Sequence, residues 1–243
     1  MVAPKEVLGK AYELTGPAML AFPQVITAEA APGIQGAKPR FSAWLVFDPK
    51  NPDYKALQSL ARDVGSIKLS PPIEFCETPL TEMEAKNLKH RMQDNPGYTS
   101  PFYLGDRVIA NAQAREYAKA VFEKREERDV GMKWLAGKVA LVARSSEEWP
   151  PKLASHGVGT LSEDQRLSAR SMFYTGALVG AGVYLRVYEA FGGGVSARLN
   201  YLYATGEGER VSTGNGGAIP FWAAQQHHVP LRQQLAEHLA EPF

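Results

Sequence analysis

The sequence has little of three features that mark common protein classes. It contains one cysteine, Cys76, so no disulfide can form within the chain. It has no long apolar run, so we expect neither a signal peptide nor a membrane span. Neither charge is in excess, because 27 Lys and Arg balance 26 Asp and Glu. We therefore expect a cytoplasmic protein, in which any site for a polyanion comes from a local arrangement of charge.

The chain has enough apolar residues for a real core, since 44% of its 243 residues are hydrophobic. The region up to about Lys38 is rich in Ala, Pro and Gly and predicts a loop. The segment 40–47, RFSAWLVF, alternates with a period of two and predicts a strand with one face toward a core. Residues 51–65 follow with apolar side chains at helical spacing, so we expect an amphipathic helix there.

The middle of the chain predicts helices and loops around one buried strand. Residues 81–94 are typical of a polar helix, and 111–130 of a helix with a solvated, mixed-charge face. A short apolar run within 134–145 predicts a buried strand, and 147–166 predicts a loop. Because prolines fragment the pattern, we interpret residues 66–131 as an insertion in a single domain over 1–228, followed by a C-terminal helix and tail over 229–243.

Residues 182–203, GVYLRVYEAFGGGVSARLNYLY, are the most informative stretch. Two alternating segments flank three glycines, which predicts a β-hairpin. In the second segment the alternation places Leu202 on the same face as Ser196, Arg198 and Asn200. Several strands with a few helices predict a mainly β (α+β) fold, a barrel or small sandwich with helical insertions, rather than a parallel βαβ array.

One face of the hairpin combines aromatic and basic side chains, Tyr184, Arg186 and Tyr188. Aromatic rings offer stacking platforms for bases, and guanidinium groups bind phosphates or stack in turn. We therefore predict a groove for a single nucleic-acid strand. The same surface could also be ordinary cross-strand packing, because tyrosine is favoured in strands. The predicted DNA-binding residues are Tyr184, Arg186, Tyr188, Arg198, Trp44, Arg40, Lys38 and Lys50.

No set of residues with catalytic spacing stands out, so we expect a protein that is not an enzyme and needs no cofactor or metal. His227 and His228 are adjacent and lack a third ligand at a recognisable spacing. The acidic residues of 74–84 resemble clustered surface acids more than a metal site. The sequence ends in Glu241, Pro242 and Phe243, a segment that either frays or inserts into an apolar pocket of a protein partner.

The order of the segments resembles a family of tailed-phage single-stranded-DNA-binding proteins, many of them long catalogued only as a domain of unknown function. The likeness covers most of the chain and is strongest in the hairpin. Its first motif is matched by Gly182, Tyr184 and Arg186. Its second motif is matched by Gly194, Val195, Ala197, Leu199, Asn200 and Gly208.

The resemblance implies a five-stranded OB-fold barrel that coats single-stranded DNA (ssDNA) in phage replication or recombination, as a homodimer in the bacterial host cytoplasm. It also implies that the Pro-Phe end recruits replication proteins. Two other functions stay open. The aromatic hairpin would be an oligomer interface in a phage structural or interaction protein, and the acids of 74–84 would hold metal in a nuclease.

Overall fold

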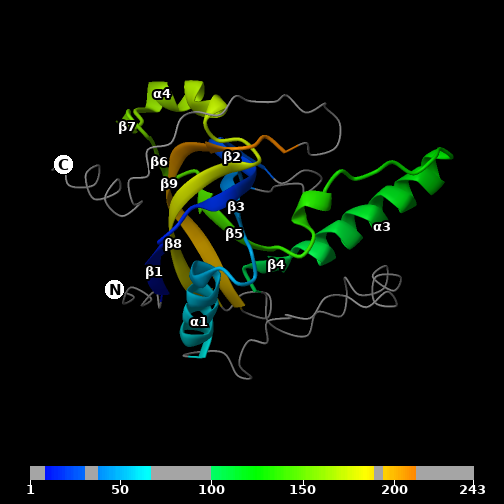
Figure 1. Cartoon of the computed structure of the whole chain (residues 1–243), viewed down its shortest axis with the longest axis horizontal. Helices are drawn as coiled ribbons and strands as arrows, with labels where there is room; N and C mark the ends of the chain where they lie inside the picture. Colours follow the sequence, from blue (N-terminus) through cyan, green and yellow to red (C-terminus); the bar gives the residue numbers. More distant parts are fainter. Residues whose placement is uncertain (1–8, 31–37, 67–99, 189–193, 212–243) are drawn as a thin grey trace.

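The computed structural model describes residues 9–30, 38–66, 100–188 and 194–211, and its centre is a ring of five strands (Figure 1). In chain order these are β2 (Ala18–Glu29), β3 (Arg40–Phe47), β5 (Val139–Ser146), β8 (Ala177–Tyr188) and β9 (Gly194–Gly208). Around the ring β2 pairs with β3, β3 with β5, β5 with β9, β9 with β8, and β8 again with β2. Only the β5–β9 pair of this ring is parallel. The arrangement is the five-stranded barrel of the OB fold, which confirms the predicted α+β fold.

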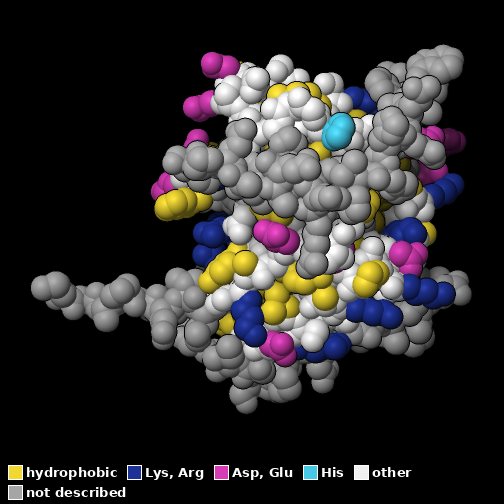
Figure 2. Space-filling view, turned by 60° about the vertical axis from the view of Figure 1, so that its left-hand side comes forward, with side chains coloured by type: hydrophobic (Ala, Val, Ile, Leu, Met, Phe, Trp, Pro, Cys, Tyr) yellow, Lys and Arg dark blue, Asp and Glu magenta, His cyan; other side chains and the backbone are white. Residues whose placement is uncertain are grey.

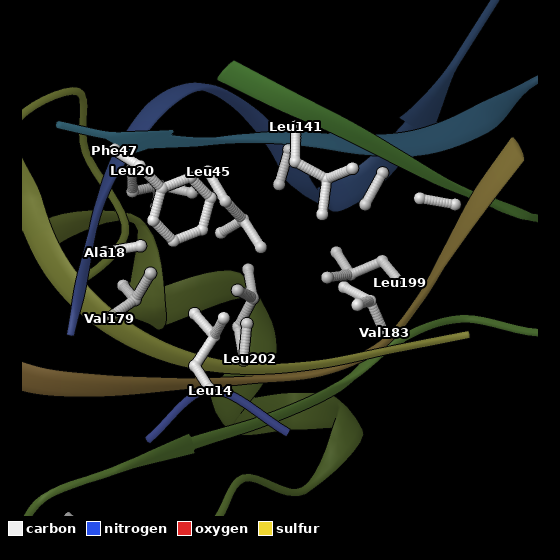
Figure 3. Packing of buried hydrophobic residues seen from close by; sticks show 14 of the residues in the cluster. Leu14, Ala18, Leu20, Leu45, Phe47, Leu141, Val179, Val183, Leu199 and Leu202 are labelled. Carbon is white, nitrogen blue, oxygen red and sulfur yellow. The ribbon is translucent and has the colours of Figure 1, made fainter. Parts of the chain in front are cut away.

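The interior of the barrel is filled by the inward residues of the alternating strands. Phe41, Ala43, Leu45 and Phe47 of β3 are all buried, as the period of two predicts. Side chains of the other four strands meet Ala43, Leu45 and Phe47 in one cluster (Figure 3). Burial of apolar area is the main force that holds such a barrel together, at roughly 25 cal/mol per Å².

Two helices lie at opposite ends of the barrel (Figure 1). The first, α1 (Pro52–Ser66), follows β3 and places Leu57 and Ala61 in the core, so the predicted amphipathic helix is confirmed. At the other end lies α4 (Glu163–Ser168), which begins with a capping box formed by Ser162 and Gln165 and continues into η2 (Ala169–Ser171). Both ends of the core are thereby covered.

Asp53, in the first turn of α1, is a buried carboxylate that ties the helix to the N-terminal part of the chain. It is 2% exposed. Its Oδ1 accepts hydrogen bonds from the hydroxyls of Tyr12 and Thr15 at 2.8 Å, and its oxygens accept from the backbone N–H groups of Thr15 and Gly16 at about 3 Å. The nearby α1 N-terminus also favours a negative charge at this position.

Two segments that the sequence predicted as loops contain strands. Before Lys38 lie β1 (Gly9–Glu13), which pairs with β8, and β2 itself. The alternation of β2 was obscured because Pro23 lies at an irregularity where the register shifts and Phe22 has a φ of 45°. Within the predicted loop 147–166 lie β6 (Lys152–Ser155), which pairs with β9, and β7 (Gly159–Thr160).

A small second cluster covers part of the outer face of β2, β3 and β5. Here β4 (Phe102–Leu104) pairs with β5, and α3 (Gly105–Glu123) and η1 (Lys133–Leu135) follow. The start of α3 packs on the barrel through Val108 and Ile109, and the rest of the helix projects away from it (Figure 1). The predicted helix 111–130 therefore exists, but it begins at Gly105 and ends at Glu123.

The prediction for Leu202 was wrong. The register between β8 and β9 shifts between Gly182 and Val183, which pair with Tyr201 and Leu199, so Asn200 is an extra residue. After this bulge Leu202 faces the core and is 0% exposed, while the Tyr201 ring lies over Gly182, where a Cβ would collide with it.

Several predictions concern residues outside the described part of the chain. They are the helix at 81–94, Cys76 and the acids of 74–84, and the whole C-terminal segment 229–243 with Glu241, Pro242 and Phe243. None of the described helices has the length and apolar character needed to span a membrane.

Candidate nucleic-acid interface

A groove of about 780 Å³ lies on the outside of the barrel, above the junction of β5 and β9. One wall comes from the start of β3 and the end of β5, and the other from the β8–β9 hairpin. Its lining includes five basic side chains, Lys38, Arg40, Arg144, Arg186 and Arg198. It also includes three aromatic ones, Tyr103, Trp149 and Tyr188.

The junction beneath the groove is held by few backbone interactions. Ala143 and Ala197 form the only β5–β9 pair in the described strands. Next to it the buried Ser145 hydroxyl donates a hydrogen bond to the Leu199 carbonyl at 2.5 Å. The two walls of the groove are thus joined over a short length, by this pair and this hydrogen bond. The space above them can hold a ligand.

The basic side chains of the hairpin wall are oriented by their neighbours on β9. Arg186 Nε donates to the Ser196 hydroxyl at 3.3 Å, and Arg198 Nε donates to Asn200 Oδ1 at 3.1 Å. A guanidinium group has five N–H donors, so each arginine keeps further donors for a phosphate after one such bond. Figure 2 shows a face of the molecule on which Lys and Arg side chains surround exposed hydrophobic ones.

The aromatic side chains differ in exposure. Trp149 is 67% exposed and Tyr103 is 41% exposed, so both present ring faces to solvent. Tyr188 is partly buried. Burial raises the pKa of its phenol, the nearby Tyr103 raises it further, and Arg144 lowers it. Tyr188, Tyr103 and Arg144 all line the groove, and the Tyr188 hydroxyl is neutral at physiological pH because its pKa lies above the usual value.

The structure brings five of the eight predicted DNA-binding residues together. Lys38, Arg40, Arg186, Tyr188 and Arg198 all line the groove, although the first two and the last three come from distant parts of the sequence. These residues come together because the barrel closes. β3 pairs with β5, and β5 pairs with β9 of the hairpin.

The other three predicted residues lie outside the groove. The Tyr184 ring packs under the Arg198 guanidinium, 5.2 Å from its centroid, and covers Gly9 of β1. Trp44 lies behind Tyr103 and also contacts Phe22. Lys50 follows the far end of β3, and since a strand rises about 3.3 Å per residue, the two ends of that strand, Arg40 and Phe47, lie roughly 23 Å apart.

Sequence reasoning missed three lining residues, Arg144, Tyr103 and Trp149. Arg144 breaks the apolar run of β5 at an outward position opposite Ser42, and that interruption was the available signal. Tyr103 and Trp149 come from short segments around prolines, where no period points to a side of the barrel. Tyr103 is placed by the pairing of β4 with β5, and Trp149 by the turn that follows β5.

Acidic residues also belong to this surface, since Glu147 and Glu148 are exposed at the rim of the groove. Within residues 9–30, 38–66, 100–188 and 194–211, no three His, Cys, Asp or Glu side chains gather closely enough to hold a metal ion. The lining thus contains five cationic side chains against two carboxylates, together with three aromatic rings, a combination that suits a polyanion with exposed bases.

Comparison with known proteins gives a likeness in fold. No protein-family model matches the sequence, and no curated protein matches it. Among solved structures, the single-stranded DNA-binding protein from bacteriophage Enc34 matches with a TM-score of 0.52 at 13% identity, over 88% of this chain and 94% of that one.

A second structure of the Enc34 protein, in complex with ssDNA, matches with a TM-score of 0.50 at 14% identity. It covers 90% of this chain and 97% of that one. Because both matches cover most of each chain, the likeness is one of overall fold. The chain therefore has the fold of the Enc34 single-stranded DNA-binding protein.

Proposed function

We propose that this protein binds ssDNA in the groove above the β5–β9 junction. The observation that carries the proposal is the lining of that groove, which combines five basic side chains with three aromatic ones. A duplex hides its bases inside the helix, whereas a single strand exposes both phosphates and base faces, so this lining suits the single strand. The shared fold with a phage protein that is named as ssDNA-binding supports the same function.

The binding mode that follows is independent of base sequence. Arg and Lys side chains neutralise phosphates, and the released counterions make the affinity fall with added salt. Stacking on Tyr103, Trp149 and Tyr188 contributes about 1–3 kcal/mol per base, and every base has a face that can stack. Such binding protects the strand and removes its secondary structure.

The biological setting belongs to the same proposal. The protein coats ssDNA during phage replication or recombination, in the cytoplasm of the bacterial host and as a homodimer. Its C-terminal Glu241, Pro242 and Phe243 contact replication proteins. These statements rest on the resemblance of the sequence to phage ssDNA-binding proteins.

Fluorescence anisotropy of a labelled oligo-dT, compared with a duplex of the same length at two salt concentrations, tests the proposal. We expect binding to the single strand that weakens with salt, and much weaker binding to the duplex. Failure to bind oligo-dT at low salt would overturn the proposal and favour the hairpin as an interface between protein chains. Mg²⁺-dependent cleavage of the strand that EDTA abolishes would instead identify a nuclease.

A further inference from the structure

The residue Trp149 stands on a short, stiff segment at the edge of the groove. Its backbone N–H donates to the Ser146 carbonyl at 3.1 Å, which closes a turn directly after β5. Pro150 and Pro151 follow. Proline fixes its own φ and restricts the residue before it, so few backbone rotations remain free between Trp149 and Pro151. We name residues 149–151 the Trp149 arm.

Arg166 of α4 holds the far end of this arm. Its Nη1 donates to the Pro151 carbonyl at 2.9 Å. The same guanidinium donates from Nε to the Ile26 carbonyl at 3.1 Å and from Nη2 to the Val25 carbonyl, both in β2. One side chain thereby joins the arm to a strand of the barrel.

The guanidinium is also fixed in direction. It lies over the ring of Phe41, with its Cζ 4.6 Å from the ring centroid, and Phe41 is buried at the start of β3. A planar, forked group that stacks and donates to three carbonyls cannot be replaced by a lysine, which offers one ammonium and no stacking plane. Burial lowers the pKa of Arg166, which is consistent with a guanidinium that is drawn into the protein.

An exposed tryptophan on a restrained arm is unusual, because a large apolar side chain normally gains from burial. Trp149 is 67% exposed, yet its backbone is restrained at both ends of the arm. A rigid platform loses little conformational freedom when a base stacks on it, and this preorganisation strengthens binding.

We propose that Arg166 is a positioning residue, which touches no DNA and holds the Trp149 arm so that the indole ring is ready to stack on a base. The inference rests on the proposed ssDNA binding. It adds a positioning role for Arg166 and a stacking role for Trp149. It predicts that the contributions of Arg166 and Trp149 to affinity are coupled.

A double-mutant cycle on oligo-dT affinity measures that coupling. Trp149→Ala should weaken binding about 5- to 100-fold, the range expected when one base can no longer stack. Arg166→Met should weaken it about 3- to 10-fold in the wild-type background and less than about twofold in the Trp149→Ala background. Arg166→Lys should fall between wild type and Arg166→Met. The dependence of affinity on salt should stay unchanged in all three variants, because none of them removes a group that binds phosphate.

Pro150→Gly serves as the second route, since it loosens the arm without altering Arg166, and keeps the test open if Arg166→Met does not fold. Pro150→Gly, like Arg166→Met, should weaken binding in the wild-type background and have much less effect in the Trp149→Ala background. The inference would be overturned if Arg166→Met or Pro150→Gly lowered the affinity equally in the wild-type and Trp149→Ala backgrounds. It would also be overturned if neither variant lowered the affinity at all. If the wild-type protein itself fails to bind oligo-dT, the proposed function falls first and the positioning role falls with it.

Discussion

Trp44 and Tyr103 stack on the outside of the barrel with ring centroids 5.6 Å apart and an angle of 28° between their planes. Trp44 belongs to β3 and also meets the Phe22 ring at 5.2 Å, so it is part of the second cluster. Tyr103 belongs to β4 and lines the groove. This pair lies where the second cluster ends and the groove begins on the outer face of β3 and β5. Trp44 therefore has a structural role, and Tyr103 a binding role.

We therefore expect different results at the two positions. Tyr103→Ala should weaken oligo-dT binding by about 1–3 kcal/mol and change the free energy of unfolding little, because the ring is 41% exposed. Trp44→Ala should lower the free energy of unfolding by about 2–4 kcal/mol, because it removes the packing of the second cluster. Anisotropy and urea unfolding on both variants measure the two effects. Equal binding by Tyr103→Ala and wild type would remove β4 from the site.

The hairpin offers a second contrast, between Tyr188 in the groove and Tyr184 beneath Arg198. Tyr188→Phe should bind like wild type, because the ring and not the hydroxyl stacks, while Tyr188→Ala should lose about 1–3 kcal/mol of affinity. Tyr184→Phe should keep the cation–π interaction with Arg198 and also bind like wild type. A large loss in Tyr188→Phe would show that the phenol, and not the ring face, contacts the strand.

The Asp53 network predicts a large effect on stability away from the groove. Asp53→Ala leaves the backbone N–H groups of Thr15 and Gly16 without their acceptor and should lower the free energy of unfolding by about 3–5 kcal/mol. Urea unfolding of this variant measures the loss. The isosteric Asp53→Asn keeps one carbonyl acceptor and should lose less. A loss below about 1 kcal/mol in Asp53→Ala would contradict the role given to this carboxylate.

Tyr12 predicts how stability changes at high pH. Burial, together with the hydrogen bond to Asp53 and its charge, raises the pKa of the Tyr12 phenol to about 12. The folded state therefore holds this proton more tightly than the unfolded chain, whose phenol titrates near pH 10. The contribution is complete below pH 10 and is lost as the pH rises toward 12. In urea unfolding, the free energy of unfolding should decline less over this pH range in Tyr12→Phe than in wild type. Identical declines in the two proteins would contradict the raised pKa of Tyr12.

Local patterns predicted the elements whose alternation is regular. β3, the second half of β8 and the first half of β9 follow a period of two, so their inward and outward residues could be assigned from sequence. The assignment failed after Asn200, where one extra residue shifts the phase and turns Leu202 inward. β2 was missed for a similar reason, since Pro23 and the irregular Phe22 interrupt it.

The lining of the groove was predictable only in part, since Tyr184 of the predicted hairpin face lies outside it. Arg186, Tyr188 and Arg198 share one local pattern and all line the groove. Lys38 lies two residues before β3 and Lys50 three residues after it, yet only Lys38 lines the groove, because the two ends of a strand lie far apart. Tyr103 reaches it through the pairing of β4 with β5, and Trp149 through the turn after β5, and no local period describes either.

Neutralising the groove tests the central claim most directly. Arg40→Gln with Arg144→Gln removes one charge from each strand of one wall, and Lys119→Gln with Lys133→Gln, two exposed lysines outside the groove, is the matched control. In anisotropy titrations over a series of salt concentrations, the groove variant should bind oligo-dT more weakly, with a salt dependence of log K reduced by about 0.7 for each phosphate that is no longer neutralised. The control should match wild type. Equal affinity and equal salt dependence in the two double variants would contradict the claim that ssDNA lies in this groove.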